Sequence, residues 1–177
     1  GTIWVEDTAA LQLVCADDGG PEVCVPLLEA FLLDDVSHAA REVFARWDGV
    51  PGGPERAISA NLINGHQPAG YERGSHTLVV QVDAVTLTGA LGEPSPFSWW
   101  PERGCDSSMD FGPAAETTAA WGAGLLPDEV YGPEVREAYE NLVGMPEADQ
   151  KDWITQVLDA YVTCDDERIA ELQAELG

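Results

Sequence analysis

The sequence predicts an α+β fold, with a disulfide-closed β-hairpin, a helix and a small sheet first and an all-helical C-terminal third. Two observations support this class. Cysteines at 15 and 24 flank a turn-forming cluster just before a helical pattern, and proline-initiated helical patterns fill the chain after residue 112. The 177 residues, 45% hydrophobic and 23% charged, suffice for one core, so we expect a single domain over residues 1–177.

The N-terminal hairpin is predicted by strand composition on both sides of a turn. Residues 2–6 (TIWVE) and 10–15 (ALQLVC) are rich in residues that favour strands. Residues 17–21 (DDGGP) form the turn cluster, and residues 23–25 (VCV) supply the return strand. The two cysteines of these strands are therefore expected to face each other.

A helix is expected directly after the hairpin. Pro26 suits its first turn, because the N–H that proline lacks would have no partner there. From Leu28 onwards apolar residues recur at helical spacing, at Leu32, Val36, Ala39, Ala40, Val43 and Trp47. Gly49 and Pro51 then end the helix, so the pattern predicts one amphipathic helix that reaches Trp47.

The middle of the chain predicts two further strands and a long loop. The strands are residues 57–63 (AISANLI) and 76–82 (HTLVVQV). Residues 83–91 (DAVTLTGAL) either continue the second strand or form a helix capped by their first aspartate, and we favour the helix. Residues 92–112 read as a loop, which Cys105 can pin.

The C-terminal third is expected to be helical throughout. The first helix covers residues 113–125, and the second begins at Pro133 and stops at Gly144. A third begins near Pro146 and carries apolar residues at helical spacing up to Cys164. A final short helix places three apolar residues on one face: Ile169, Leu172 and Leu176.

The cysteines indicate the compartment. There are four, none in a C-x-x-C pair or at a spacing that suits zinc. Of the three possible connectivities we predict Cys15–Cys24 and Cys105–Cys164. Disulfides form in oxidising surroundings, so we expect a secreted, extracellular or cell-surface location.

The charge of the chain excludes some partners. It has 32 acidic and 8 basic residues, a formal net charge of −24. Such a field repels nucleic acid and anionic membrane surfaces. No apolar run approaches the roughly 20 residues that cross a bilayer, so we expect no direct insertion in a membrane. A protein or cell-envelope partner remains the expected class.

The residue types that carry chemistry form no recognisable catalytic motif. His66 and His76 flank a Gly-containing loop and could meet across a hairpin as metal ligands, but a metal site usually needs three or four ligands. His38 has no second histidine at helical spacing. Ser75–His76 and residues 107–108 (SS) supply no triad geometry by adjacency alone. We therefore assign no catalytic residue, no metal ligand and no cofactor.

Acidic turns are candidates for calcium. Residues 17–20 (DDGG) and 106–110 (DSSMD) offer carboxylates, yet neither matches the ligand spacing of an EF-hand loop. A solvated acidic turn is the simpler interpretation of both.

Aromatic residues in the long loop form the candidate binding patch. Phe97, Trp99 and Trp100 could stack on a sugar or a peptide if they are exposed. The alternative is that the loop buries one of them as an anchor on the core.

The chain resembles extracytoplasmic domains at the ends of uncharacterised actinobacterial membrane proteins, some related to ABC-transporter permeases. The residues that carry the resemblance are 23–26 (VCVP) after the first cysteine, 49–54 (GVPGGP) after the first helix, and Trp153 with Cys164 eleven positions on. These are structural residues. The resemblance implies an extracytoplasmic domain and reports no activity.

The order of elements is also similar to the N-terminal half of zinc-metallopeptidase-like folds. In that family a helix carries His-Glu-x-x-His, but the corresponding stretch here, residues 81–86 (QVDAVT), has no histidine. This similarity implies a non-catalytic relative.

Together these observations predict a non-catalytic binding or accessory domain of a membrane or cell-envelope protein. The alternative is a secreted hydrolase whose site is built from scattered Asp, Glu and His. A cleft lined by Asp or Glu of raised pKa, with a histidine in reach, would favour the hydrolase. A smooth acidic surface with an exposed patch of Trp99 and Trp100 would favour binding.

Overall fold

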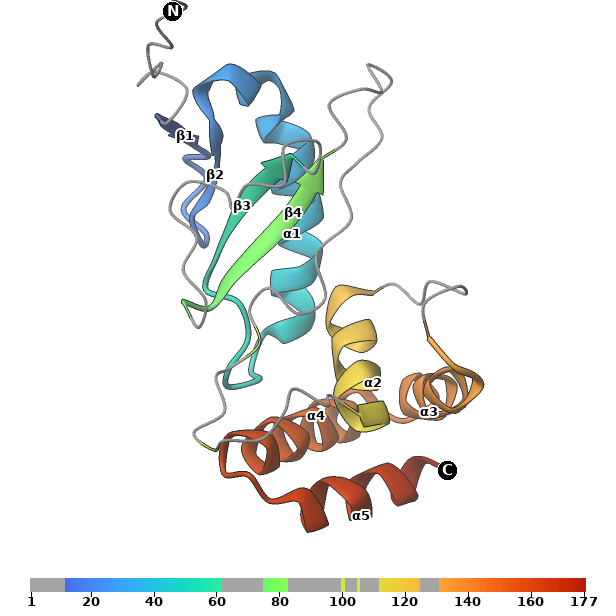
Figure 1. Ribbon diagram of the computed structural model, residues 1–177. Helices are drawn as coiled ribbons and strands as arrows, with labels where there is room; N and C mark the ends of the chain where they lie inside the picture. The colour runs from blue at the N-terminus through green and yellow to red at the C-terminus, as the bar shows by residue number, and fades with distance from the viewer. Residues whose placement is uncertain (1–11, 62–74, 83–99, 101–104, 106–111, 125–130) are drawn as a thin grey trace, which may run out of the picture.

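The predicted α+β class is confirmed by the computed structural model, which describes residues 12–61, 75–82, 100, 105, 112–124 and 131–177. Its four-stranded sheet has the order β1-β2-β3-β4, with β1 (Leu13–Cys15), β2 (Val23–Pro26), β3 (Arg56–Asn61) and β4 (Thr77–Val82). The first two strands are antiparallel, whereas β3 is parallel to both of its neighbours. The helix α1 (Leu33–Trp47) connects β2 to β3 and lies along one face of the sheet (Figure 1).

Strands β2, β3 and β4 carry buried side chains on both faces of the sheet. Side chains that face α1 join the main core: Val23, Val25, Ala57, Leu78, Val80 and Val82. On the opposite face Cys24, Ile58 and Val79 form a second buried cluster. Burial on both faces is typical of parallel strands and explains why β4 (TLVVQV) reads as a nearly continuous apolar run.

The helix after the hairpin begins later than its pattern predicts. Pro26 is the last residue of β2, with ψ 145°, and a 3-10 helix, η2 (Leu27–Leu32), precedes α1. The prediction that Pro26 opens the helix is therefore wrong, because this residue is extended and pairs with Leu13. Glu29 inside η2 has a non-helical φ of −109°. After Glu29, the predicted apolar stripe is confirmed by the buried residues of α1: Val36, Ala40, Val43 and Trp47.

The sequence predicts the strands β3 and β4 but not their orientation, which is parallel. Both predicted strands exist, but their register runs in the same direction, from Arg56↔Thr77 to Asn61↔Val82. β3 and β4 therefore do not form a hairpin with each other, and the hypothesis that His66 meets His76 is not tested. His76 lies at the beginning of β4, at the opposite end of the sheet from the end of β3. The predicted strand 2–6, His66 and the predicted helix 83–91 lie outside the described residues.

Four helices make up the C-terminal part, as predicted: α2 (Gly112–Ala123), α3 (Pro133–Val143), α4 (Glu147–Val162) and α5 (Asp166–Leu176). Pro133 opens α3, and the Asp165 side chain caps α5 by accepting the Arg168 N–H at 3.0 Å. α2 is the most buried of the described helices, and it lies between α1 and the other C-terminal helices (Figure 1). Its alanines and threonines have side chains small enough for close helix packing on several sides at once.

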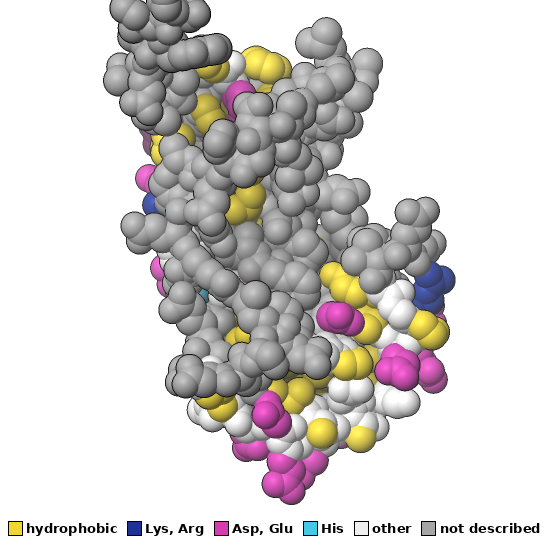
Figure 2. All heavy atoms as spheres, in the orientation of Figure 1, with side chains coloured by type: hydrophobic (Ala, Val, Ile, Leu, Met, Phe, Trp, Pro, Cys, Tyr) yellow, Lys and Arg dark blue, Asp and Glu magenta, His cyan; other side chains and the backbone are white. Residues whose placement is uncertain are grey.

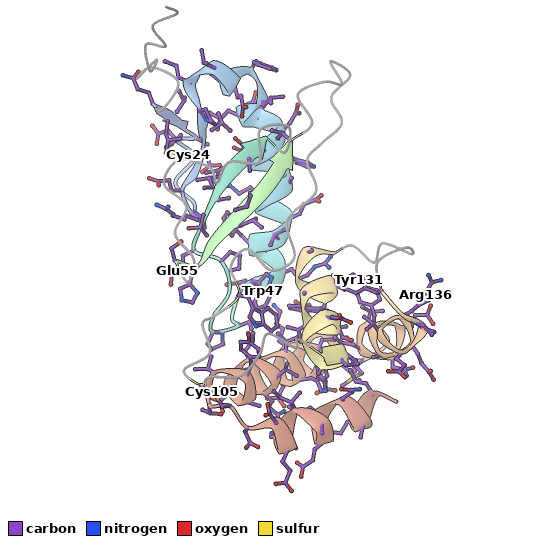
Figure 3. The ribbon with its side chains drawn as sticks, in the orientation of Figure 1. Cys24, Trp47, Glu55, Cys105, Tyr131 and Arg136 are labelled. Atoms are coloured by element: carbon purple, nitrogen blue, oxygen red, sulfur yellow. A yellow bond between two sulfur atoms is a disulfide. The ribbon has the colours of Figure 1, made fainter. Side chains whose placement is uncertain are left out.

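Trp47, the last residue of α1, joins this helix to the C-terminal helices (Figure 3). Its indole N–H donates to the Gly122 carbonyl (3.2 Å), and its ring meets Trp121 edge-on at 5.4 Å between centroids. The neighbouring Arg46 donates to the carbonyl of Trp121 at 2.7 Å. One continuous buried cluster contains residues of the sheet, of α1 and of all four C-terminal helices. The expected single core therefore extends across both parts.

Gly122 provides the first testable prediction. A Cβ at this position would lie 2.5 Å from Cζ2 of Trp47, inside the core. We expect Gly122→Ala to lower the free energy of unfolding by about 1–3 kcal/mol through overpacking, measured by urea denaturation. Gly132→Ala is the matched control, since a Cβ there meets nothing within 4 Å. Equal effects of the two substitutions would contradict the packing described for Gly122.

Candidate binding surface

Both predicted disulfides are present, and no cysteine is free. Cys105–Cys164 ties residue 105 to the end of α4 across a sequence separation of 59. Cys15 and Cys24 are direct partners in the register of β1 and β2, with Cα atoms 4.0 Å apart. This pair does not exchange backbone hydrogen bonds, and the close Cα approach at such pairs is what a cross-strand disulfide needs.

Trp100 does not belong to an exposed binding patch. It is 6% exposed and packs edge-on against Tyr161 of α4, at 5.3 Å between ring centroids. The anchor interpretation therefore holds for Trp100, because its ring joins the main core. Phe97 and Trp99 lie outside the described residues.

The two described histidines lie apart from each other. His38 is exposed on α1 and approaches Glu42 one turn later, at 3.6 Å between Nε2 and Oε1. His76 has a positive φ of 52°, and its carbonyl accepts the N–H of Glu55 at 2.8 Å. His76 thus contributes to the turn that starts β4, next to the side-chain pair Ser75 and Thr77.

The acidic turn of the hairpin binds the side chain of Arg41, which belongs to α1. Arg41 donates from Nε to Oδ2 of Asp18 at 3.0 Å, and a second nitrogen of the guanidinium contacts Oδ1. The Gly20 N–H also donates to this carboxylate. These bonds lower the pKa of the Asp18 carboxyl, with the Arg41 bond as the largest cause and the Gly20 bond next. The Asp18 carboxylate therefore already accepts hydrogen bonds from Arg41. This pairing favours the interpretation of residues 17–20 as a solvated acidic turn over that of a calcium-binding loop.

Metal-ligand geometry occurs at one place in the part of the chain that the structure describes. Cys15, Glu22 and Cys24 bring one potential ligand atom each within 4.8 Å of one another. The two sulfur atoms are bonded to each other, so neither is a thiolate ligand. With this bridge formed, the cluster offers only the carboxylate of Glu22.

An exposed apolar surface lies at the end of the sheet where β2 passes into η2. Four large hydrophobic side chains of β1 and η2 are exposed there, and we refer to them together as the η2 surface: Leu13 (41% exposed), Leu27 (41%), Leu28 (65%) and Phe31 (74%). Exposed hydrophobic side chains are visible at the top of the view in Figure 2. Single exposed apolar residues are ordinary on a protein surface, whereas large contiguous apolar patches are typical of interaction sites.

Sequence reasoning missed the η2 surface. The sequence analysis placed Leu28 at the start of the apolar stripe of one helix and made no prediction for Leu27 or Phe31. One feature of the sequence could have identified these residues. Leu27 and Phe31 do not share the helical spacing of Leu32, Val36 and Trp47, so a single helix face could not bury all five side chains.

Acidic residues are the only charged residues other than histidine in the segment that contains the η2 surface. Residues 12–40 contain no lysine or arginine and six carboxylates: Asp17, Asp18, Glu22, Glu29, Asp34 and Asp35. Asp34 and Asp35 are exposed in the first turn of α1, and Glu29 accepts a bond from Ser59 Oγ at 3.2 Å. Glu29, Asp34 and Asp35 therefore lie in or directly after η2, whereas the other three carboxylates belong to the turn at the opposite end of the hairpin.

The paired carboxylate of Asp18 predicts a pH effect. Its folded-state pKa lies below the ordinary 3.8, so its contribution to stability is present above pH 3.8 and is lost as the pH falls through the folded pKa. We expect wild type to be more stable than Asp18→Asn at pH 6, and this difference to shrink below pH 3.8. Urea denaturation across this range measures it. Asp17→Asn is the control, since Arg41 bonds Asp18 and not Asp17. A stability difference between wild type and Asp18→Asn that did not change with pH would contradict the lowered pKa of Asp18.

None of the helices in the described ranges is both long enough and apolar enough to span a membrane. In the comparisons with known proteins, no family model, no curated protein and no solved structure matches the chain.

Proposed function

We propose that this chain is a non-catalytic binding or accessory domain that works outside the cytoplasm, beside a membrane or cell-envelope protein. The observation that carries the proposal is the η2 surface, on which four large hydrophobic side chains stay exposed beside a well-packed core. Hydrophobic side chains that gather on a surface lower their free energy when a partner covers them.

The remaining observations support the same class of protein. Two disulfides favour an oxidising compartment. The net charge of −24 keeps the chain away from nucleic acid and from anionic membrane surfaces. Neither described histidine supports the alternative of a hydrolase: His38 pairs with Glu42 on an open helix face, and His76 starts a strand.

Site-specific cross-linking in the source cells tests the binding function. Phe31 is replaced by p-benzoylphenylalanine, and the cells are irradiated intact. We expect a covalent adduct of defined mass, because Phe31 is the most exposed residue of the η2 surface. Val162 carries the same probe as the control, since it is an exposed hydrophobic residue at the end of α4. No adduct at 31, or the same adducts from both positions, would overturn the proposal.

The redox state in living cells tests the compartment. Cells that make the chain from its own gene are quenched in acid, and free thiols are tagged with a maleimide-polyethylene glycol. We expect no tagged thiol before reduction and four after it, since both bridges are closed. Four tagged thiols before reduction would show a reducing compartment and contradict an extracytoplasmic location.

A further inference from the structure

We propose that the β1–β2 hairpin becomes a binding site for a thiophilic divalent cation such as Zn²⁺ when the Cys15–Cys24 bridge is opened. The ligands are the two thiolates and the carboxylate of Glu22. This inference goes beyond the proposed binding function, because its ligand is a metal ion and its residues do not belong to the η2 surface. The closed bridge supplies neither thiolate, so the state of the bridge decides whether the site exists.

The three ligand atoms are already close together in the folded chain. The two sulfur atoms and a carboxylate oxygen of Glu22 lie within 4.8 Å of one another, which occurs at no other place in the described part of the chain. A tetrahedral ion with Zn–S bonds of about 2.3 Å places its two sulfur ligands about 3.8 Å apart. Since this separation is smaller than the span of the three atoms, rotation of the two freed side chains suffices to place the ion between them.

Backbone contacts hold the strands of the hairpin together independently of the bridge. The Ala16 N–H donates to the Val23 carbonyl at 2.9 Å, directly beside the two cysteines. The Glu22 carbonyl accepts the Ala57 N–H at 2.8 Å, which fixes the residue that carries the third ligand. Because β2 also pairs with β3, the positions of Glu22 and Cys24 depend on the sheet and not on the bridge.

The turn between the two cysteines is held from outside the hairpin. Arg41 of α1 donates to the Asp18 carboxylate at 3.0 Å and to the Pro21 carbonyl at 2.8 Å. Both acceptors lie between Cys15 and Cys24 in the sequence. These bonds keep the turn closed when the sulfur atoms separate, so most of the ordering that a metal site requires is present before the ion binds.

The hairpin bridge is the more accessible of the two disulfides. Cys15 is exposed, whereas Cys105 and Cys164 are both half-buried. Exposed disulfides are the labile ones in thiol–disulfide exchange. One thiolate of a dithiol reductant attacks the Cys15 sulfur to form a mixed disulfide, and the Cys24 sulfur leaves and takes up a proton. The second thiol then displaces Cys15, so the reductant becomes a disulfide and the two cysteines gain two electrons and two protons.

The ligand set selects a soft ion. Thiolates favour Zn²⁺ and related ions, whereas Ca²⁺ and Mg²⁺ take oxygen ligands. Glu22 adds one oxygen ligand, and three protein ligands leave the fourth tetrahedral position to water. The net charge of −24 attracts cations to the protein. Binding releases the protons of the two thiols, because only the thiolates are ligands.

Titration of the full chain with Cd²⁺ tests the inference, because Cd²⁺ also binds thiolates and these bonds absorb in the ultraviolet. The chain is reduced with dithiothreitol, which is then removed by gel filtration without oxygen. We expect one Cd²⁺ per reduced chain with the thiolate absorption, and none for the oxidised chain. Glu22→Gln should weaken binding at least about tenfold. Glu134→Gln on α3 is the matched control, since it removes an equal charge away from the hairpin (Figure 1). Equal affinities of the two variants would overturn the inference.

Alkylation of the cysteines locates the site and gives an answer even if reduction loosens the fold. The reduced chain is treated with iodoacetamide with and without Zn²⁺, and the modified cysteines are identified by peptide mass spectrometry. We expect Zn²⁺ to protect Cys15 and Cys24 and to leave the reactivity of Cys105 and Cys164 unchanged. Any other pattern, including equal reactivity of all four, would count against the site. So would Cd²⁺ binding of unchanged affinity by Cys15→Ser/Cys24→Ser.

Discussion

Replacing Trp47 by alanine is expected to lower the free energy of unfolding by about 3–5 kcal/mol, the range for deletion of a buried tryptophan. Trp47 is only 4% exposed and packs edge-on against Trp121. Its indole N–H also bonds the Gly122 carbonyl, which would be left buried without this donor. The packing, the aromatic pair and the hydrogen bond are therefore lost together.

Urea denaturation followed by circular dichroism measures this effect. Phe31→Ala is the control, because it also removes an aromatic ring but from a side chain that is 74% exposed. We expect the control to change stability by less than about 0.5 kcal/mol, as is usual for surface substitutions. Similar losses for the two variants would mean that Trp47 does not hold the sheet and the helices together.

Removal of the Cys105–Cys164 bridge is the second large effect expected. The bridge closes a loop with a sequence separation of 59, and the chain-entropy argument gives it about 4 kcal/mol. Cys15–Cys24 closes a separation of only 9, for which the same argument gives about 3 kcal/mol. The double variant Cys105→Ala/Cys164→Ala should therefore be the less stable of the two disulfide-deleted proteins.

The comparison requires non-reducing conditions and the same denaturant series for both double variants. Cys15→Ala/Cys24→Ala is the matched control, since it also deletes one bridge and two sulfur atoms. If the hairpin bridge proved to stabilise more than the long one, the loop-entropy ranking would be wrong. Cys24 lies 1% exposed in the second buried cluster, so its packing on the sheet would then outweigh the difference in loop entropy.

Much of the fold could be predicted from the sequence because its signals are local. The spacing of Val36, Ala40 and Val43 identified α1, and Pro133 identified the start of α3. The pairing of Cys15 with Cys24 followed from the turn residues between them. Each of these features depends on neighbours within a few positions along the chain.

The features that were missed depend on contacts between distant residues. No residue in or near β3 and β4 specifies that the two strands are parallel, since an apolar strand sequence fits either a parallel or an antiparallel neighbour. Pro26 fits a helix start by composition, but its pairing with Leu13 keeps it in the strand. The η2 surface was missed for the same reason. Leu28 is exposed because of its position at the end of the folded sheet, whereas leucine as a residue type is most often buried.

The bond from Trp47 to Gly122 joins residues 75 positions apart, and this separation bears on folding kinetics. A contact of that span is reached only after the entropy of closing a long loop has been overcome, whereas the β1–β2 hairpin closes over a sequence separation of 9. We therefore expect the hairpin to form early in refolding. The later docking of α1 on α2 would then be the slow step of refolding. The sheet would reach its full stability only at this step.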